Sequence, residues 1–350
     1  MSIALSAVVV LAPVPVSAKA AQQVQIAINQ VDFSRFPEVR AFVAVVDAER
    51  RPIAGLPASA FQLQHDGVRL STFRLESLRT SREPIALVLA IDRSGSMRGE
   101  PIRQALAAAE ALIRGLDDKD LIGLVGFDDK VAVLAAPTRQ HATVVEHLRT
   151  ATLGRDTAIN DAVLEALNQV TPVQLRRKAV LLLTDGKENR SKAALDAVIE
   201  AASRALVPIH TVGLGPSVDR RALRRMSDGT GGMALESKRP ADLVGLFEQI
   251  GGFLKNEYVM TFATRGGEDV WHEISVAVAV AGAAAEARLP YRVATESGGG
   301  SGLSRSARAS RAQSRLVIGI AVGIIVAGMV GSTITVVIWR RRQIRGSRRY

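Results

Sequence analysis

Three side chains with oxygen atoms stand together where an apolar run ends. The run "PIALVLA" (residues 84–90) is typical of a buried strand, and "IDRSGSM" follows it with Asp92, Ser94 and Ser96. Gly95 interrupts the segment, which favours a tight loop. Oxygen groups gathered at a strand end suit three roles: holding a hard cation, binding a phosphate or capping a helix. Other parts of the chain have to decide among them.

A second apolar run also ends on an acid. "KAVLLLTDGKEN" places Asp185 directly after a predicted strand, and "LGRDTAINDAV" places Thr157 where a loop passes into a predicted helix. In a parallel sheet, strand ends of this kind meet at one edge, where ligands gather. Hydroxyl ligands with few direct carboxylates leave a bound ion underneutralised, which favours Mg²⁺ (or Mn²⁺ or Ca²⁺) with an open coordination position. The expected metal-site residues are Asp92, Ser94, Ser96, Thr157 and Asp185.

The elements that must position these groups alternate between strand and helix. The apolar strands "IALVLAI", "LIGLVGF", "KAVLLLT" and "VPIHTVGLG" are separated by helical stretches such as residues 101–115. Near-continuous apolar strands between amphipathic helices are typical of α/β proteins. We therefore expect a doubly wound, mostly parallel sheet over residues 84–255.

The order of these motifs resembles that of the von Willebrand factor A (VWA) domain family. Its metal-ion-dependent adhesion site has the form Asp-x-Ser-x-Ser, then a distant Thr, then Thr-Asp-Gly at a strand end. Here "DRSGSM", "RDTAINDAV" and "TDG" match all five positions in order, within residues 84–255. The resemblance implies direct metal bonds from the three hydroxyls and indirect roles, through water or hydrogen bonds, for the two aspartates. It also implies that a carboxylate from a partner protein completes the metal shell.

One position departs from the family's pattern. The residue before the family's threonine is commonly glycine, and here it is Asp156, whose carboxylate would either strengthen metal binding or repel an acidic partner. The loops also carry basic residues, Arg155 among them, which would attract an acidic partner if they surround the site, unless they are simply solvated. The candidate rim residues for partner binding are Arg93, Arg98, Asp156 and Lys187.

Two β-rich segments flank this region. Residues 21–83 and 256–294 show short alternating strands between turns, which are typical of antiparallel sheets. Each segment is thin for an independent core. We expect the two to pair into one small sandwich, with the VWA-like domain of residues 84–255 inserted between them. The run "GLPASAFQLQHDG" is also similar to the leading segment of bacterial proteins with such a domain.

The net charge of +11 is concentrated near the C-terminus. Residues 296–350 hold ten arginines and one glutamate, so the remainder is nearly neutral, which argues against a nucleic-acid partner. Residues 316–339 carry no charge, and as a helix they would reach about 36 Å, enough to span a bilayer. We expect a flexible linker (295–315), this transmembrane helix, and a basic cytoplasmic tail (340–350).

The N-terminal segment sets the expected orientation. Residues 1–20 have the apolar core and small residues of a secretory signal peptide, although a basic n-region is missing. This favours a cell-membrane protein whose body lies outside the cytoplasm. Small residues recur every fourth position of the expected span, a face that suits self-association or packing with a partner helix. They are Gly319, Gly323, Ala327 and Gly331.

Catalysis finds little support in the sequence. There is no cysteine, so thiolate metal sites and disulfides are excluded. The G-x-S-x-G, P-loop and G-x-G-x-x-G motifs are absent. The five histidines are scattered outside any motif, so neither Ser94 nor Ser96 has an evident base, and His210 is expected inside a sheet.

We therefore expect a membrane-anchored extracytoplasmic domain that is not an enzyme. It would bind a protein partner through a divalent metal, in adhesion or another protein–protein interaction. The alternative is a structural or assembly factor of a membrane complex, with a mainly architectural metal. Under the first hypothesis loss of the metal site abolishes partner capture and leaves the fold intact, whereas under the second it lowers stability and assembly alike.

Overall fold

The computed structural model describes residues 24–149, 154–264 and 270–292. They form two compact units. The α/β unit comprises residues 83–251, and the β unit comprises the other described residues, from both ends of the chain. The signal peptide, linker, membrane span with its small-residue face, and basic tail expected from the sequence lie outside the described residues. Within the described ranges, no helix is both long enough and apolar enough to cross a bilayer.

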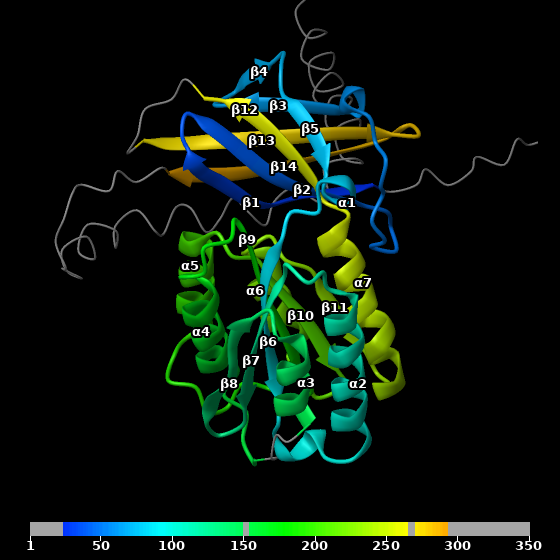
Figure 1. Cartoon of the computed structure of the whole chain (residues 1–350), viewed down its shortest axis with the longest axis vertical. Coiled ribbons are helices and arrows are strands. Elements are labelled where there is room, and N and C mark those ends of the chain that lie inside the picture. Colours follow the sequence, from blue (N-terminus) through cyan, green and yellow to red (C-terminus); the bar gives the residue numbers. More distant parts are fainter. Residues whose placement is uncertain (1–23, 150–153, 265–269, 293–350) are drawn as a thin grey trace, which may run out of the picture. The chain divides into compact units, whose positions relative to one another are not determined.

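A six-stranded sheet lies at the centre of the α/β unit, in the order β11-β10-β9-β6-β7-β8 (Figure 1). Its strands are β6 (Ile85–Asp92), β7 (Leu121–Phe127), β8 (Val131–Thr138), β9 (Arg177–Thr184), β10 (Ile209–Leu214) and β11 (Ala234–Ser237). Neighbouring strands are parallel except β7 and β8. The expected α/β fold is confirmed, and its sheet is mixed because β8 runs antiparallel at one edge.

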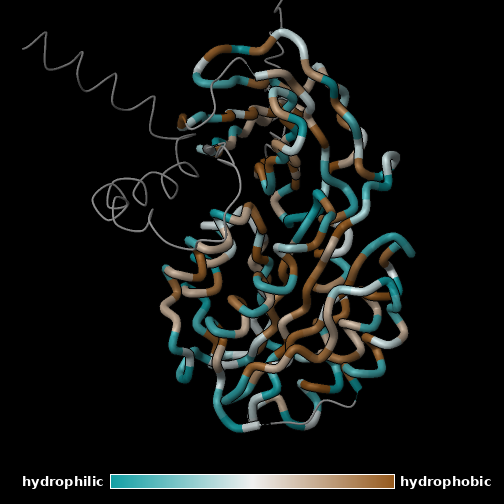
Figure 2. Tube along the Cα trace, turned by 60° about the vertical axis from the view of Figure 1, so that its left-hand side comes forward, coloured by the Kyte–Doolittle hydropathy of each residue, from teal (hydrophilic) through white to brown (hydrophobic). Residues whose placement is uncertain are grey.

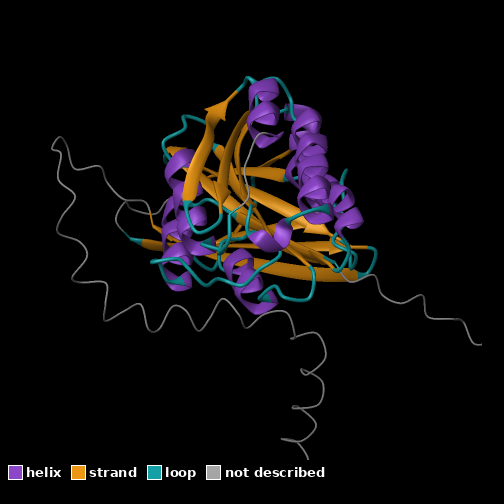
Figure 3. Ribbon diagram, turned by 90° about the horizontal axis from the view of Figure 1, so that it is seen from below, coloured by secondary structure: helices purple, strands orange, loops and turns teal. Residues whose placement is uncertain are grey.

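Helices cover both faces of this sheet (Figure 1, Figure 3). They are α2 (Glu100–Gly115), α3 (His141–Arg149), α4 (Ile159–Val170), α5 (Leu195–Ala205), α6 (Arg220–Asp228) and α7 (Leu243–Lys255), with the short 3-10 helices η2 (Gly95–Met97) and η3 (Pro240–Asp242). Helices α4, α5 and α6 share one apolar core with alternate residues of the strands, for example Val163 with Val88 and Val180. Because both of its faces are covered, β6 is buried along its whole length, and the central strands are hydrophobic in Figure 2.

Two four-stranded antiparallel sheets make up the β unit, in the orders β1-β2-β12-β5 and β14-β13-β3-β4. Phe61 packs against Tyr258 with ring centroids 5.1 Å apart, and Phe33 stacks on Tyr291 at 4.6 Å, so the two sheets face each other. The strands are β1 (Gln25–Arg35), β2 (Glu38–Val46), β3 (Phe61–His65), β4 (Val68–Leu70), β5 (Arg74–Ser77), β12 (Tyr258–Ala263), β13 (Trp271–Val280) and β14 (Ala283–Arg292); the short helices are η1 (Ala58–Ala60) and α1 (Leu78–Ser81).

Each of these sheets combines strands from before and after the α/β unit in the chain. Strand β12 lies between β2 and β5, and β13 pairs with β3 so that Ile274 stands opposite His65. Residues about 200 positions apart therefore become neighbours through strand pairing alone.

Candidate metal centre

The first group of oxygen atoms lies at the end of β6. Asp92 is the last residue of this strand and is fully buried. One of its carboxylate oxygens accepts a hydrogen bond from the backbone N–H of Ser94 at 2.8 Å, and the other accepts one from the hydroxyl of Thr184. Both oxygens are thus fixed in place, and the Asp92 carboxylate holds the start of the loop that carries Ser94 and Ser96.

The second group comes from β9, the parallel neighbour of β6. Strand β9 ends at Thr184, and Asp185 follows it directly. The Ser96 hydroxyl donates to Asp185 Oδ1 at 2.7 Å and lies 3.1 Å from the Ser94 hydroxyl oxygen. Since β6 and β9 are parallel and adjacent, their carboxyl ends bring the Ser96 hydroxyl into contact with both Ser94 and Asp185.

Thr157 reaches the same edge from the loop that precedes α4. Its backbone N–H donates to the side-chain oxygen of Asn189 at 2.9 Å, and its carbonyl accepts from the Asn189 N–H at 3.2 Å. A Cβ atom placed on Gly186 would stand 3.1 Å from the Thr157 hydroxyl oxygen, so this hydroxyl lies against the turn that follows Asp185. The structure therefore brings all five predicted metal-site residues to one edge of the sheet.

The loop that carries Thr157 is fastened to the ends of β6 and β7. Gly154 N–H donates to the Arg93 carbonyl at 2.8 Å, and Ala158 N–H donates to the Asp128 carbonyl at 2.9 Å. A Cβ atom on Gly154 would stand only 2.4 Å from Asp128 Cγ, so only glycine allows the loop to approach this closely. Sequence reasoning gave no role to three supporting residues, although Thr184 belongs to the "TDG" motif and Asp128 directly follows β7. They are Asp128, Thr184 and Asn189.

Burial disfavours the ionised forms of Asp92 and Asp185 in the absence of a cation. It raises the pKa of Asp92 to about 6, with a smaller contribution from the nearby charge of Asp185, and it also raises the pKa of Asp185. A positive ion at this edge would favour both ionised forms. The donor set consists of hydroxyl and carboxyl oxygens, which suits a hard cation.

The oxygen spacing fits such an ion as well. Octahedral Mg²⁺ holds oxygens at 2.0–2.1 Å, so neighbouring ligand oxygens stand about 3 Å apart. The separations of 3.1 Å between Ser94 and Ser96 and 2.7 Å between Ser96 and Asp185 lie close to this value. Ser96 is exposed and Asp185 partly exposed, so a ligand can reach the site from solvent.

The predicted rim residues differ in what they present to solvent. Arg98 and Lys187 are exposed and Asp156 is partly exposed, as expected of a rim. Arg93 is only 7% exposed, and its guanidinium pairs with Asp128 Oδ2 at 3.3 Å. Gly126 leaves room for it, since a Cβ there would lie 2.5 Å from Arg93 Nε. Arg93 therefore supports the loop from inside, and we leave it out of the proposed rim.

Comparison with known proteins assigns the α/β unit. The family model of the von Willebrand factor type A domain matches residues 86–249. An uncharacterized protein of Synechocystis sp. (sll0103) is 25% identical over 201 residues, which are 56% of this chain and 47% of that protein. The human calcium-activated chloride channel regulator 4 is 31% identical over 183 residues, 50% of this chain and 19% of that protein. The chain thus spans less than half the length of either relative.

Among solved structures, a von Willebrand factor type A protein from Catenulispora acidiphila matches with 16% identity and a TM-score of 0.47, covering 80% of this chain and 76% of that one. The family model and the fold of the α/β unit agree on the same stretch of chain. Residues 86–249 of this chain are a von Willebrand factor type A domain.

Proposed function

We propose that this chain binds a protein partner through a divalent cation held by Ser94, Ser96 and Thr157. The observation that carries the proposal is the meeting of hydroxyls and acids from three loops at one sheet edge, at the spacing of ligand oxygens. We expect Mg²⁺, or Mn²⁺ or Ca²⁺ in its place. When bound, the ion supplies a positive centre with a coordination position that a carboxylate of the partner can take.

The protein's own groups would hold and present that centre. In the metal-bound state the three hydroxyls are ligands, and Asp92 and Asp185 orient them or bind through water. Asp92 is already fixed by two hydrogen bonds, so little reorganisation is needed for it to support Ser94. The exposed side chains of Arg98, Arg155 and Lys187 stand on the same loops, where their positive charge would attract an acidic partner.

We propose binding rather than catalysis at this edge. Where the structure describes it, the Ser96 hydroxyl donates to a carboxylate, and its neighbour Ser94 lies beside it at 3.1 Å. Neither hydroxyl is joined to an imidazole by a hydrogen bond in the described residues, so an activated serine nucleophile is not supported.

We also propose that this domain is displayed outside the cytoplasm. The support comes from the sequence: the signal-peptide features of residues 1–20 and the uncharged run of residues 316–339. The charged tail after the run would fix the anchor on the cytoplasmic side. Self-association or partner packing through the face of Gly319, Gly323, Ala327 and Gly331 belongs to the same proposal.

A capture experiment tests the partner-binding proposal. The detergent-solubilised full chain is passed over immobilised poly-glutamate, an acidic probe, with Mg²⁺ or with EDTA. Capture should require Mg²⁺ and should be lost in Thr157→Ala, whereas Thr143→Ala, a matched change on α3 away from the site, should behave like the wild type. Equal capture in EDTA would contradict the proposal.

The same proteins distinguish the second candidate function, an assembly factor with an architectural metal. The complete burial of Asp92 is the observation that favours it, because an ion compensating a buried acid would also stabilise the fold. Under that function, EDTA and Asp92→Ala lower the melting temperature together. Under the function proposed first, Asp92→Ala abolishes capture and the fold stays intact.

A further inference from the structure

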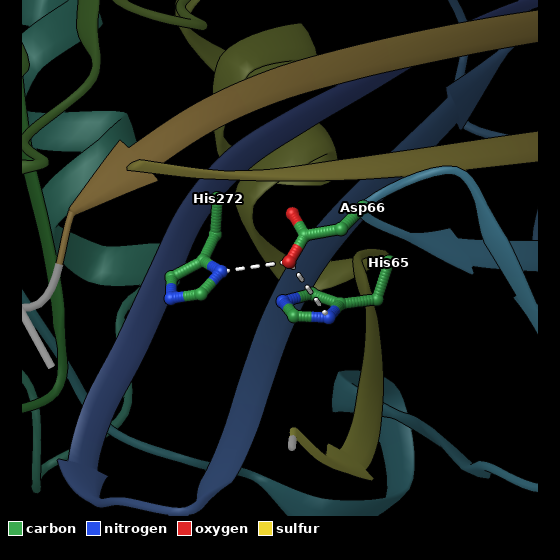
Figure 4. A group of neighbouring side chains, drawn as sticks. All are labelled: His65, Asp66 and His272. Carbon is green, nitrogen blue, oxygen red and sulfur yellow. Dashed lines mark hydrogen bonds and ion pairs between the residues drawn. The ribbon is translucent and has the colours of Figure 1, made fainter. Parts of the chain in front are cut away.

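A second cluster of candidate metal ligands lies in the β unit and shares no residue with the candidate metal centre of the α/β unit. His65 ends β3, Asp66 follows it in the turn to β4, and His272 stands near the start of β13. Figure 4 shows both imidazoles turned toward the same carboxylate. The ligand atoms of the three residues all lie within 4.8 Å of one another. A separation of more than 200 residues hides this cluster from sequence inspection.

Strand pairing and a tight turn build the cluster. Asp66 and Gly67 both have positive φ angles, 51° and 75°, as in the two-residue turns that join antiparallel strands. The Asp66 backbone N–H donates to the Glu273 carbonyl at 2.9 Å, and the Glu273 N–H returns a bond to Asp66 Oδ1 at 2.8 Å. These bonds fix the carboxylate so that its other oxygen, Oδ2, faces the two histidines.

The distances within the cluster are compatible with a shared ion, although one of them is also that of a hydrogen bond between His272 and Asp66. His272 Nδ1 lies 2.8 Å from Asp66 Oδ2, whereas His65 Nδ1 lies 3.6 Å from it, too far for a hydrogen bond. In tetrahedral Zn²⁺ sites, with bonds of 2.0–2.1 Å, neighbouring ligand atoms are about 3.3 Å apart. The two measured separations lie on either side of that value.

An outer shell of polar groups supports the histidines. The second ring nitrogen of His65, Nε2, lies 2.6 Å from the hydroxyl of Tyr291 and 3.4 Å from that of Thr264. A partner on the far nitrogen is what orients metal-binding histidines and fixes their tautomer. The arrangement leaves Nδ1 of His65 directed at Asp66.

Burial and access also suit a metal. The side chains of His65 and His272 are 8% and 4% exposed, so both imidazoles are shielded from bulk water. The Asp66 side chain is 41% exposed, which leaves an entry path and a place for water.

We propose that His65, Asp66 and His272 bind one Zn²⁺-like transition-metal ion, with water as the fourth ligand. Two imidazoles and one carboxylate select such an ion over Mg²⁺, which prefers oxygen ligands alone. The site is chemically distinct from the hydroxyl-lined edge of the α/β unit and is independent of the function proposed for that edge.

The test is titration of the detergent-solubilised full chain with ZnCl₂ by calorimetry, with Mg²⁺ present in large excess to occupy the oxygen site. We expect one Zn²⁺ per chain. Asp66→Asn keeps a residue that accepts positive φ, and both it and His272→Asn should weaken binding by more than the roughly 10- to 100-fold that loss of an outer-shell partner costs. His147→Asn on α3 should leave binding unchanged.

A spectroscopic readout identifies the ligands. Co²⁺ in place of Zn²⁺ should give the intense visible absorption of a tetrahedral site, and this absorption should disappear in His65→Asn. Circular dichroism in the metal-free state checks that each variant is folded. Zn²⁺ binding that is absent from the wild type, or that is unchanged in Asp66→Asn and His272→Asn, would overturn the proposal.

Discussion

Asp92→Asn should make the metal-free protein more stable at neutral pH. The Asp92 carboxyl is fully buried, and burial raises its pKa from 3.8 to about 6. At 1.36 kcal/mol for each pKa unit, the ionised acid costs the folded state about 3 kcal/mol at pH 7. Asparagine removes this cost. Asparagine has an amide NH₂ group in place of one carboxylate oxygen, and this group cannot accept a hydrogen bond. One of the two hydrogen bonds to Asp92, worth about 1 kcal/mol, therefore changes partner or is lost. The expected net gain is about 2 kcal/mol.

The sign of the pH dependence follows from the direction of the shift. A carboxyl with a raised folded-state pKa gives its full relative stability below pH 3.8, and this stability is lost as the pH rises to about 6. Wild type should therefore lose about 2 kcal/mol relative to Asp92→Asn between pH 4 and pH 7 in EDTA, since part of the stability is already lost at pH 4. Mg²⁺ should reverse the order at pH 7, because it favours the ionised acid of the wild type.

Urea titration in EDTA, monitored by hydrogen exchange of peptides from β6 and β9, measures the stability of the α/β unit. Asp118→Asn, a change at an exposed acid, serves as the control and should alter stability little. The reasoning is refuted if Asp92→Asn is less stable than wild type at pH 7, or if the difference between the two is the same at pH 4.5.

Three further predictions concern the supports of the site and the sheet. Gly154→Ala should displace the Thr157 loop, destabilise the unit by about 1–3 kcal/mol and weaken Mn²⁺ binding measured by electron paramagnetic resonance. Gly115→Ala, whose added Cβ meets nothing within 4 Å, should do neither. Arg93→Met and Asp128→Asn should each cost about 3–5 kcal/mol, since each leaves a buried charge without its partner. In urea unfolding, the double variant should lose less stability than the sum of the losses in the two single variants. Additive losses would argue against an energetic coupling between Arg93 and Asp128. Burial lowers the pKa of His210 to about 4. The free energy of unfolding of the α/β unit should therefore be unaffected by His210 above pH 6.5 and should fall by about 3 kcal/mol as the pH drops to 4. His210→Asn should reduce this dependence of stability on pH. If the pH dependence is unchanged in His210→Asn, it arises from other groups.

The sequence was informative where the chemistry follows strand order. Asp92 and Asp185 each stand directly after a buried apolar run, and the structure makes those runs the adjacent parallel strands β6 and β9. Thr157 was predicted from its place between a loop and a helix and from the family resemblance, but the contacts of Asn189 and Asp128 that position its loop leave no local pattern. That these residues hold a metal remains a prediction.

Long-range pairing and side-chain direction were beyond the sequence. Arg93 stands in a loop of oxygen ligands and was expected at the rim, yet it turns inward to Asp128 because Gly126 leaves space for its guanidinium. His65 and His272 are brought together by the antiparallel pairing of β3 with β13. Neither segment alone indicates which strand it will pair with, so the two histidines seemed unrelated in the sequence.

The central claim is that side chains of three loops share one divalent ion at the edge of the VWA sheet. A crystal structure of the protein grown with Mn²⁺, with anomalous scattering recorded for the metal, tests this claim most directly. We predict one strong peak within about 2.4 Å of the hydroxyl oxygens of Ser94, Ser96 and Thr157. The account is contradicted if crystals grown at saturating Mn²⁺ show no peak at this edge, or if the ion there contacts none of the three hydroxyls.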